Sequence, residues 1–373
     1  MDRCLRIAWD NSLAGRDLAG TGAYAAGLLR ELSKIPELHV EVFSGWDATN
    51  QHSGLLTSST RTLTRLVWSH GRLPQLLRRG RFDLLHSPAF VAPLACPCPI
   101  VVTVHDLAIK MFPDYFDWRW RAYINATLPS VLRAGSAVIC VSEYSRQELL
   151  RFYKIPPERV HVVYNGIDHT CYNPAATLDF AWSQNLGLQR GYLLHVGALS
   201  HRKNIPTLLQ AVAILRSRGK WTNRQLVLAG PRIPSLPGMA AIHDTILELD
   251  LSGSVLLTGR VPDQHMPALY VHASILVMPS LYEGFGFPAL EAMACGTPVV
   301  ASNMSSLPEI TGDAALLVSP TDADALAAAI EGVMEHRSLA EELRRKGLER
   351  ARQFSWQRTA TETAAIYHIA AKS

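Results

Sequence analysis

Two glutamates, Glu283 and Glu291, follow a short apolar run at 275–278 and have seven residues between them. Gly284 and Gly286 lie in that interval, and a backbone without Cβ atoms can approach a ligand closely and direct N–H groups at it. Each carboxylate accepts two hydroxyl hydrogens, as binding a vicinal diol of ribose or a hexose requires. The simpler alternative is that Glu291 complements a helix dipole and Glu283 is a solvated loop acid. The pair alone leaves both interpretations open.

A helix is predicted to begin directly after these glycines. Pro288 suits the first turn of a helix, and Gly296 suits its end. Glu283 is therefore expected in a loop and Glu291 in the opening turn of the helix.

Two adjacent cations, Arg202 and Lys203, follow another apolar run at 192–196 and precede a predicted helix. A guanidinium can bind phosphate bidentately, and an ammonium supplies a point charge. An Arg-Lys pair is more often a solvated surface feature. Its place at a strand end, in the same half of the chain as the glutamates, favours a diphosphate site.

The first half of the chain carries two further candidates. His105 follows the apolar run 100–104, and Gly20 and Gly22 lie in the loop expected after the first strand. A histidine at a strand end is more often structural than catalytic, but the expected cleft location favours a role at the site. The glycines would let the backbone approach a phosphate or an acceptor, although their spacing with Gly27 is not that of the dinucleotide fingerprint.

These candidates fall at strand ends, and loops at the carboxyl ends of strands form the ligand sites of open α/β sheets. Short apolar runs alternate with helical periodicity along the chain, which is typical of parallel sheets covered by helices. The fold class is therefore predicted to be α/β, with two doubly wound units. The strands are predicted at 5–9, 39–43, 84–86, 100–104, 137–141 and 160–164 in the first half and at 192–196, 225–228, 255–257, 275–278 and 299–301 in the second. Helices are expected to begin near residues 22, 118 and 143.

A polar stretch at 165–187 is interpreted as a turn and linker between the two units. The predicted domains are an N-terminal one at 1–170 and a C-terminal one at 171–355. Apolar residues at helical spacing after residue 356 predict a last helix, 356–373, that packs back on the N-terminal domain.

Length and composition narrow the class of protein. A chain of 373 residues fits two domains, and a net charge of +4 gives no reason to expect nucleic-acid binding. Cys96 and Cys98 have no matching second pair, so no metal site is predicted. The first residues lack the apolar core of a signal peptide, and four prolines interrupt the most apolar run, 88–104. A cytoplasmic protein that does not span a membrane is therefore expected.

The region from 61 to 81, called here the basic segment, contains no acidic residue and alternates basic with apolar side chains. Two interpretations stay open for it: a surface helix pair with solvated arginines, or contact with an anionic membrane at its inner face. Its arginines are Arg61, Arg65, Arg72, Arg78, Arg79 and Arg81.

These segments, taken together and in order, resemble retaining glycosyltransferase family 4, which has the GT-B fold, and in particular its mannosyltransferase-like subgroup of bacterial polysaccharide biosynthesis. The resemblance spans nearly the whole chain. The matching segments are Glu283 with Glu291, the run 284–288, the runs 292–298 and 305–309, Val196-Gly197, Arg202-Lys203-Asn204, Gly259-Arg260-Val261-Pro262, His105-Asp106, Asn165-Gly166-Ile167-Asp168 and Phe354-Ser355-Trp356.

The resemblance implies two Rossmann-like domains facing a cleft and a donor site in the second domain. It assigns Glu291 to the nucleotide ribose and Glu283 to the transferred sugar. The other implied contacts are Phe285, Gly286 and Phe287 with sugar hydroxyls, Arg202 and Lys203 with the diphosphate, Gly259, Arg260 and Val261 with the base, Gly20, Thr21 and Gly22 with phosphate or acceptor, and His105 with the reacting face of the sugar. Gly197 belongs to the same donor set, but the next residue is Ala198 where many members carry arginine.

The predicted function is that of a retaining, metal-independent hexosyltransferase with no cofactor besides its co-substrate, a nucleoside diphosphate sugar. GDP-mannose is the first candidate donor and a UDP-hexose the second, and the acceptor is a hydroxyl of a glycan or a lipid-linked glycan. A glycoside hydrolase would also use two carboxylates, but the cationic loop counts against it. The alternatives kept are a GT-B-like epimerase or phosphorylase and a non-enzymatic nucleotide-sugar-binding protein.

Overall fold

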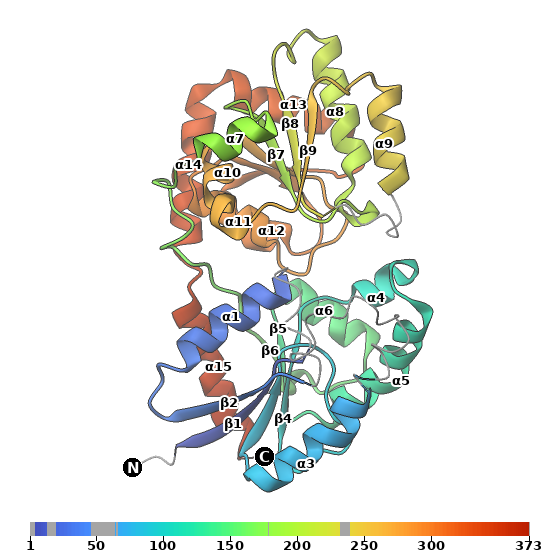
Figure 1. Cartoon of the computed structure of the whole chain (residues 1–373), viewed down its shortest axis with the longest axis vertical. Helices are drawn as coiled ribbons and strands as arrows, with labels where there is room; N and C mark the ends of the chain where they lie inside the picture. The colour runs from blue at the N-terminus through green and yellow to red at the C-terminus, as the bar shows by residue number, and fades with distance from the viewer. Residues whose placement is uncertain are drawn as a thin grey trace. The chain divides into compact units, whose positions relative to one another are not determined.

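The computed structural model describes residues 4–12, 20–45, 64, 66–177, 179–231 and 239–372. The chain divides into two compact units (Figure 1). The N-terminal unit comprises Met1–Gly166 together with Phe354–Ser373, and the C-terminal unit comprises Ile167–Gln353. The boundaries predicted from the sequence lie after residues 170 and 355.

The N-terminal unit contains a parallel six-stranded sheet in the order β2-β1-β3-β4-β5-β6. Its strands are β1 (Leu5–Asp10), β2 (Leu38–Phe43), β3 (Leu84–Ser87), β4 (Ile100–Val104), β5 (Ala137–Cys140) and β6 (Val160–Val162). Every residue of β3, β4 and β5 is buried, as expected when helices cover both faces of a parallel sheet.

Helices lie on both faces of this sheet (Figure 1). On one face α1 (Gly20–Leu32) packs beside α15 (Trp356–Ala370), so the last helix of the chain belongs to the N-terminal unit, as predicted. The other face carries α3 (Leu73–Gly80), which continues the π-helical turn η2 (Trp68–Arg72), together with α5 (Trp118–Ala134) and α6 (Glu143–Phe152). Short elements follow β4 and α6: α4 (Ala108–Met111), η3 (Pro113–Tyr115) and η4 (Pro157–Arg159).

The C-terminal unit contains a second parallel six-stranded sheet, in the order β12-β11-β10-β7-β8-β9. Its strands are β7 (Leu193–Val196), β8 (Leu226–Ala229), β9 (Val255–Gly259), β10 (Ile275–Met278), β11 (Val299–Ser302) and β12 (Ala315–Val318). The chain builds outward from β7 to one side and then from β10 to the other. The strand order therefore reverses between β7 and β10, where open α/β sheets bind their ligands.

Eight helices of the described residues surround this second sheet, with two 3-10 turns. They are α7 (Phe180–Leu186), η5 (His201–Lys203), α8 (Ile205–Ser217), α9 (Met239–Glu248), η6 (Asp263–His265), α10 (Met266–Val271), α11 (Phe287–Ala294), α12 (Leu307–Thr311), α13 (Ala323–Glu335) and α14 (Arg337–Ala351). Among the described residues, five helix starts have a Ser or Asp side chain that accepts a backbone N–H hydrogen bond, which stabilises the first turn. These residues are Asp117, Ser142, Asp179, Asp322 and Ser355.

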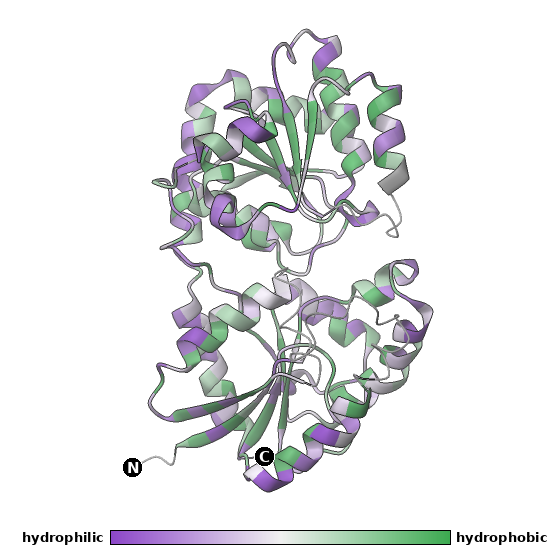
Figure 2. Ribbon diagram, viewed as in Figure 1, coloured by the Kyte–Doolittle hydropathy of each residue, from purple (hydrophilic) through white to green (hydrophobic). Residues whose placement is uncertain are grey.

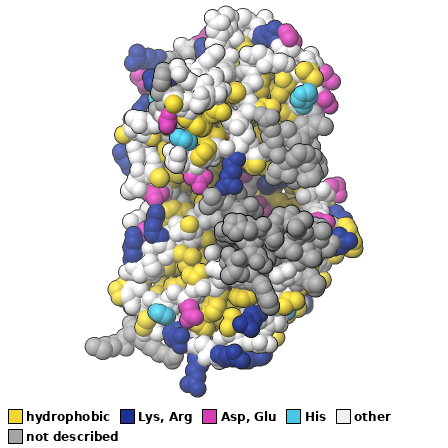
Figure 3. All heavy atoms as spheres, in the orientation of Figure 1, with side chains coloured by type: hydrophobic (Ala, Val, Ile, Leu, Met, Phe, Trp, Pro, Cys, Tyr) yellow, Lys and Arg dark blue, Asp and Glu magenta, His cyan; other side chains and the backbone are white. Residues whose placement is uncertain are grey.

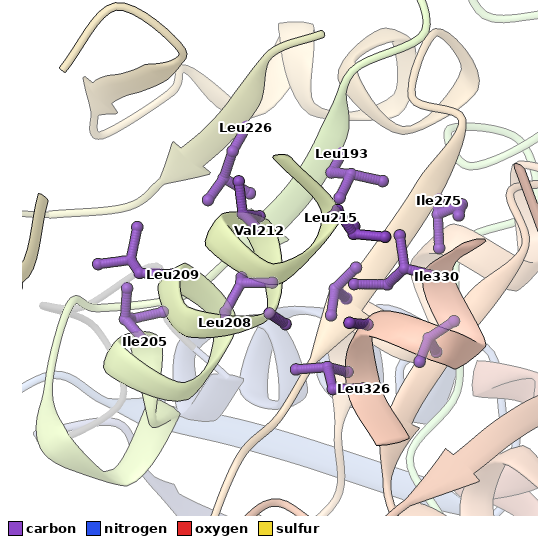
Figure 4. Close-up of a cluster of buried hydrophobic side chains, with 14 of the residues drawn as sticks. Leu193, Ile205, Leu208, Leu209, Val212, Leu215, Leu226, Ile275, Leu326 and Ile330 are labelled. Atoms are coloured by element: carbon purple, nitrogen blue, oxygen red, sulfur yellow. The ribbon is translucent and has the colours of Figure 1, made fainter. Parts of the chain in front are cut away.

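The core of the C-terminal unit lies between α8, α13 and the sheet (Figure 4). Leu208, Leu209, Val212 and Leu215 recur at helical spacing along α8 and are fully buried. Ile330 of α13 packs in the same cluster. Figure 2 shows the same division in both units, with hydrophobic strands inside and helices that are hydrophobic on one side.

Each predicted strand is present, but several local predictions were wrong. β12, a four-residue strand at the edge of the second sheet, was not predicted. The predicted linker 165–187 contains α7, which Asp179 caps by accepting a hydrogen bond from the backbone N–H of Trp182. Gly20 to Gly22 form the first turn of α1 and not a loop.

Candidate active site

A buried ion pair joins two of the predicted site residues. Lys203 Nζ lies 2.5 Å from Glu283 Oε1, and each side chain is only 9% exposed. Ser280 Oγ donates to the same carboxylate oxygen at 2.8 Å. Burial alone would raise the pKa of Glu283, but the charges of Lys203 and Arg202 and these hydrogen bonds together bring it below its ordinary value. Glu283 is therefore an ionised carboxylate held inside the protein.

Two strand-end loops bring this pair together. Lys203 ends η5, which follows β7, and Glu283 lies in the loop between β10 and α11. The β7–β10 ladder pairs only Leu193 with Ile275 and Leu194 with Leu276, so the two strands separate toward their carboxyl ends. The backbone N–H of Leu281 then donates to the carbonyl oxygen of Arg202 at 2.8 Å and ties the two loops directly.

A third loop, between β11 and α12, supports the backbone around Glu283. The N–H of Glu283 donates to Ser305 Oγ at 3.0 Å. Ser306 Oγ hydrogen bonds to the carbonyl oxygens of Glu283 at 3.0 Å and Phe285 at 2.9 Å. Gly286 is the N-cap residue of α11. The run from Glu283 to Gly286 is thus fixed by hydrogen bonds before the helix begins.

Glu291 occupies a different environment from Glu283. It is the fifth residue of α11, so it begins the second turn rather than lying in the opening turn as predicted. Tyr270 donates to its Oε2 at 2.6 Å, and Tyr172 also hydrogen bonds to it. Burial raises the pKa of Glu291, and the two tyrosines offset only part of that rise. Sequence reasoning missed both tyrosines, and Tyr172 lies in the stretch interpreted as a linker.

The segment Gly259–Val261 lies at the end of β9, at the same carboxyl edge of the sheet. The carbonyl oxygen of Gly259 accepts a hydrogen bond from the N–H of Gly230 at 2.9 Å. Arg260 is exposed and Val261 is buried. The loops after β7, β9 and β10 therefore all contribute predicted site residues to one edge of the C-terminal unit.

His105 belongs to the N-terminal unit and lies directly after β4. Its Nε2 donates to the carbonyl oxygen of Pro88 at 2.8 Å, because a carbonyl can only accept. Its ring packs edge-on against Tyr24 with centroids 4.8 Å apart. Burial lowers the pKa of His105, although Pro88 and Asp106 oppose that shift. The imidazole is therefore neutral at physiological pH, with its lone pair on Nδ1.

Two family models match the chain. Residues 18–170 match the model described as Glycosyltransferase Family 4, and residues 179–352 match the one described as Glycosyl transferases group 1. The O-antigen chain mannosyltransferase B of Escherichia coli is 32% identical over 381 residues, which cover 94% of this chain and 96% of the relative. This chain is a family 4 glycosyltransferase.

Solved structures show which fold the glycosyltransferase has. Sucrose-phosphate synthase from Thermosynechococcus elongatus matches with a TM-score of 0.79 and 23% identity and covers 98% of each chain. The Anabaena protein HepE, solved in complex with UDP and glucose, matches with a TM-score of 0.73 and 21% identity over 97% of this chain and 98% of HepE. With its two parallel six-stranded sheets, the glycosyltransferase has the GT-B fold.

The structure of the glycosyltransferase brings some predicted residues together and separates others by unit. Lys203 and Glu283 are in direct contact, and Arg202 acts electrostatically on Glu283. His105 and the turn Gly20–Gly22 belong to the N-terminal unit. Within the described residues, no group of three or more His, Cys, Asp or Glu side chains is arranged to hold a metal ion. None of the described helices has both the length and the apolar character that crossing a membrane demands.

Gly197 of the glycosyltransferase provides the space that Lys203 occupies. Its φ is +148°, and a Cβ built there would lie 2.8 Å from Lys203 Cε. We expect Gly197→Ala to displace Lys203 and to lower the free energy of unfolding by about 1–3 kcal/mol. Urea denaturation measures this effect. Gly219→Ala is the matched control, because Gly219 also has a positive φ but its Cβ would meet nothing within 4 Å. An equal loss in both variants would contradict a steric role for Gly197.

Proposed function

We propose that this glycosyltransferase moves a hexose, with mannose as the first candidate, from a nucleoside diphosphate sugar to a hydroxyl of a glycan or a lipid-linked glycan. We further propose that the anomeric configuration is retained. The observation that carries the proposal is the buried contact between Lys203 and Glu283. It holds a phosphate-binding cation beside a hydroxyl-binding carboxylate, and a sugar diphosphate presents phosphate and sugar hydroxyls side by side.

The choice of donor rests on the relatives. A relative named as a mannosyltransferase of O-antigen chains supports mannose as the sugar and a surface polysaccharide as the product. The HepE complex with UDP and glucose supports a nucleoside diphosphate sugar as the donor class. GDP-mannose is therefore the first candidate and a UDP-hexose the second.

The proposed mechanism uses charge and position, with no protein base. Arg202 and Lys203 stabilise the negative charge that grows on the diphosphate as the glycosidic bond breaks. Glu283, ionised and fixed by Ser280, accepts hydrogen bonds from the sugar hydroxyls. The departing phosphate oxygen takes the proton of the acceptor hydroxyl on the same face of the sugar, which retains the configuration. Because cations of the chain supply the charge stabilisation, the proposal includes neither a divalent metal nor a separate cofactor.

The remaining contacts complete the proposed donor site. Glu291 would accept hydrogen bonds from the ribose diol, with Tyr270 holding one of its oxygens in place. Phe285, Gly286 and Phe287 would direct backbone groups at the sugar. The residues Gly259, Arg260 and Val261 would lie along the base, Gly197 beside the diphosphate, Gly20, Thr21 and Gly22 near phosphate or acceptor, and His105 near the reacting face of the sugar.

A thermal-shift panel tests the donor class. A ligand that binds only the folded state stabilises it by about 2.7 kcal/mol when its concentration is 100 times its Kd. We expect GDP-mannose and GDP to raise the Tm most, UDP-hexoses to raise it less, and mannose alone to leave it unchanged. If only UDP-hexoses raised the Tm, a UDP-hexose would become the proposed donor in place of GDP-mannose. Stabilisation by no nucleotide at all would contradict a nucleotide-sugar donor.

Product analysis with a labelled donor tests the reaction itself. We expect release of nucleoside diphosphate together with a labelled glycan whose anomeric configuration matches that of the donor. A product with the opposite anomeric configuration would contradict the proposed retaining mechanism. An isomerised or unchanged donor in the presence of a competent acceptor would favour an epimerase or a simple binding protein.

The basic segment is relevant to whether the enzyme contacts a membrane surface. Leu73 and Leu77 of α3 are buried in the core of the N-terminal unit, so the apolar side of this helix is already covered. The arginines of the basic segment that the structure describes are exposed. They are Arg72, Arg78, Arg79 and Arg81, while Arg61 and Arg65 lie outside the described residues. Figure 3 shows basic side chains on the surface of the N-terminal unit. We propose a cytoplasmic enzyme that contacts the inner face of the membrane by charge alone.

Vesicle sedimentation tests this contact. We expect binding to vesicles with anionic lipid, weak binding to neutral vesicles, and release at about 1 M salt, where the screening length is about 3 Å. Replacing Arg78 and Arg79 by serine should weaken sedimentation. Replacing Arg337 and Arg345 of α14, whose side chains are also exposed, by serine provides the control. Equal binding to neutral vesicles would contradict an electrostatic contact.

A further inference from the structure

A chain of four hydrogen-bonded side chains crosses the interior of the N-terminal unit. The hydroxyl of Tyr367 on α15 hydrogen bonds to Nδ1 of His86 on β3. Nε2 of His86 hydrogen bonds to the hydroxyl of Thr103 on β4 at 2.8 Å. The same Thr103 oxygen lies 2.9 Å from the hydroxyl of Tyr24 on α1. All four residues have an exposed fraction of 0%, so side chains of β3 and β4 link α15 to α1 without a solvent-exposed member.

The protonation states of these groups are fixed by burial. It lowers the pKa of His86 to about 3, and it raises the pKa of both Tyr24 and Tyr367 above the ordinary value. All four groups are therefore neutral at physiological pH. Neutral His86 has one N–H, so the hydrogen bonds run either from Tyr24 to Tyr367 or in the reverse direction. In both directions the Tyr24 hydroxyl stays bonded to Thr103.

Tyr24 is the member of the chain that reaches His105. Thr103 lies in β4, and His105 directly follows that strand. The hydroxyl of Tyr24 is bonded to Thr103, and its ring packs edge-on against His105 at 4.8 Å and 83°. The carbonyl oxygen of Pro88 holds the Nε2 side of the imidazole. Between them, Tyr24 and Pro88 set the plane and the tautomer of His105.

The last helix of the unit supports Tyr24 from behind. The ring of Trp356, at the start of α15, lies 6.3 Å from the Tyr24 ring. It packs against Gly27, where a Cβ would come within 2.2 Å of the indole. This close approach of α15 to α1 is possible only because Gly27 has no side chain.

We propose that Tyr24 is a positioning residue that holds the His105 imidazole in one ring plane and one tautomer for its part in sugar transfer. This inference rests on the proposed role of His105 beside the reacting sugar. Tyr24 itself touches no substrate, and its effect on transfer passes through His105. The Thr103 hydroxyl fixes Tyr24, and the chain through His86 to Tyr367 fixes Thr103.

A double-mutant cycle tests the proposal, with kcat for sugar transfer and Kd for the nucleoside diphosphate as readouts. We expect Tyr24→Leu to lower kcat about tenfold or more and to leave Kd within about threefold, because small displacements of a group at the reacting centre cost rate strongly. Tyr24→Phe keeps the ring and should recover most of the rate. In a His105→Ala background, Tyr24→Leu should cause no further loss.

The controls separate positioning from general packing. Thr103→Val removes the anchoring hydroxyl with little change of shape, so it should lower kcat less than Tyr24→Leu and also lose its effect in His105→Ala. Tyr153→Leu replaces another buried tyrosine of the unit, one whose hydroxyl has no hydrogen-bond partner among the described residues, and it should leave kcat unchanged.

Two results would overturn the proposal in distinguishable ways. If Tyr24→Leu lowers kcat by the same factor with and without His105, or does not lower it at all, Tyr24 does not act through His105 and the role of His105 stands. If His105→Ala itself transfers sugar at the parental rate, the proposed role of His105 fails, and the positioning role of Tyr24 fails with it.

Discussion

Replacement of Lys203 by methionine is expected to lower the free energy of unfolding by about 3–5 kcal/mol, the usual cost of removing one partner of a buried ion pair. Glu283 would stay buried with only Ser280 and the more distant Arg202 to stabilise its charge. Urea denaturation of the parent and the variant measures the loss. A further exchange, Glu283→Leu in the Lys203→Met background, should recover much of it, because no unpaired charge is then buried.

The pH dependence of this loss has a definite sign. In the parent, burial of Glu283 is outweighed by its cationic and hydrogen-bonding partners, so its folded-state pKa lies below the ordinary value. The resulting stabilisation is present at neutral pH and disappears as the pH falls through that pKa. In Lys203→Met burial dominates and raises the folded-state pKa, so protonation favours the folded variant. The difference in stability between parent and variant should therefore narrow from neutral pH toward about pH 4.

An exposed ion pair provides the control for this prediction. Arg337 and Glu341 on α14 form a pair at 2.7 Å, with side chains 91% and 62% exposed. Arg337→Met should change the free energy of unfolding far less than Lys203→Met does, because solvent screens an exposed pair. A comparable loss in Arg337→Met and Lys203→Met, or no change with pH, would show that burial of the Lys203–Glu283 pair does not govern its stability.

Glu283→Gln should lower the rate of sugar transfer by a factor of about 100 to 1,000, the range found when one group that stabilises transition-state charge is removed. The amide keeps the size of the side chain and removes its negative charge. The Kd of the nucleoside diphosphate should stay within about threefold, since the proposed partner of Glu283 is the sugar. Single-turnover kinetics with the preferred donor and calorimetric titration with its nucleoside diphosphate provide the two measurements.

Ser280→Ala is the matched control for Glu283→Gln. It removes the 2.8 Å hydrogen bond to Glu283 Oε1 and leaves the charge in place, so the transfer rate should fall far less. If Glu283→Gln turned over at the parental rate, Glu283 would have no part in the reaction. If it lost nucleotide binding and transfer equally, Glu283 would hold the diphosphate region together without contacting the sugar.

The sequence was sufficient to predict the two parallel sheets, because their inner strands β3, β4, β5, β8 and β10 are short apolar runs that are buried throughout. It also placed the site residues at strand ends, and Pro288 lies in the first turn of α11 as predicted. The features that it could not predict depend on contacts between residues that are far apart in the sequence. Lys203 and Glu283 are 80 positions apart, and nothing in either local segment indicates that β7 and β10 are neighbours.

Two further features depend on packing that no local pattern reports. Tyr172 hydrogen bonds to Glu291 from a stretch whose polar composition reads as a linker. In the same stretch α7 packs Trp182 in a stack on His265, with ring centroids 4.5 Å apart. The seven-residue α7 has too little apolar periodicity to predict by itself.

The membership of α15 in the N-terminal unit has a consequence for synthesis on the ribosome. The C-terminal unit is one continuous segment, Ile167–Gln353, so all of its strands and helices are available before Trp356–Ala370 is made. The N-terminal unit, although synthesised first, lacks the hydrogen-bond partner of His86 Nδ1 until Tyr367 is made. Since domains generally fold as they emerge, the first unit to begin folding is the last to finish.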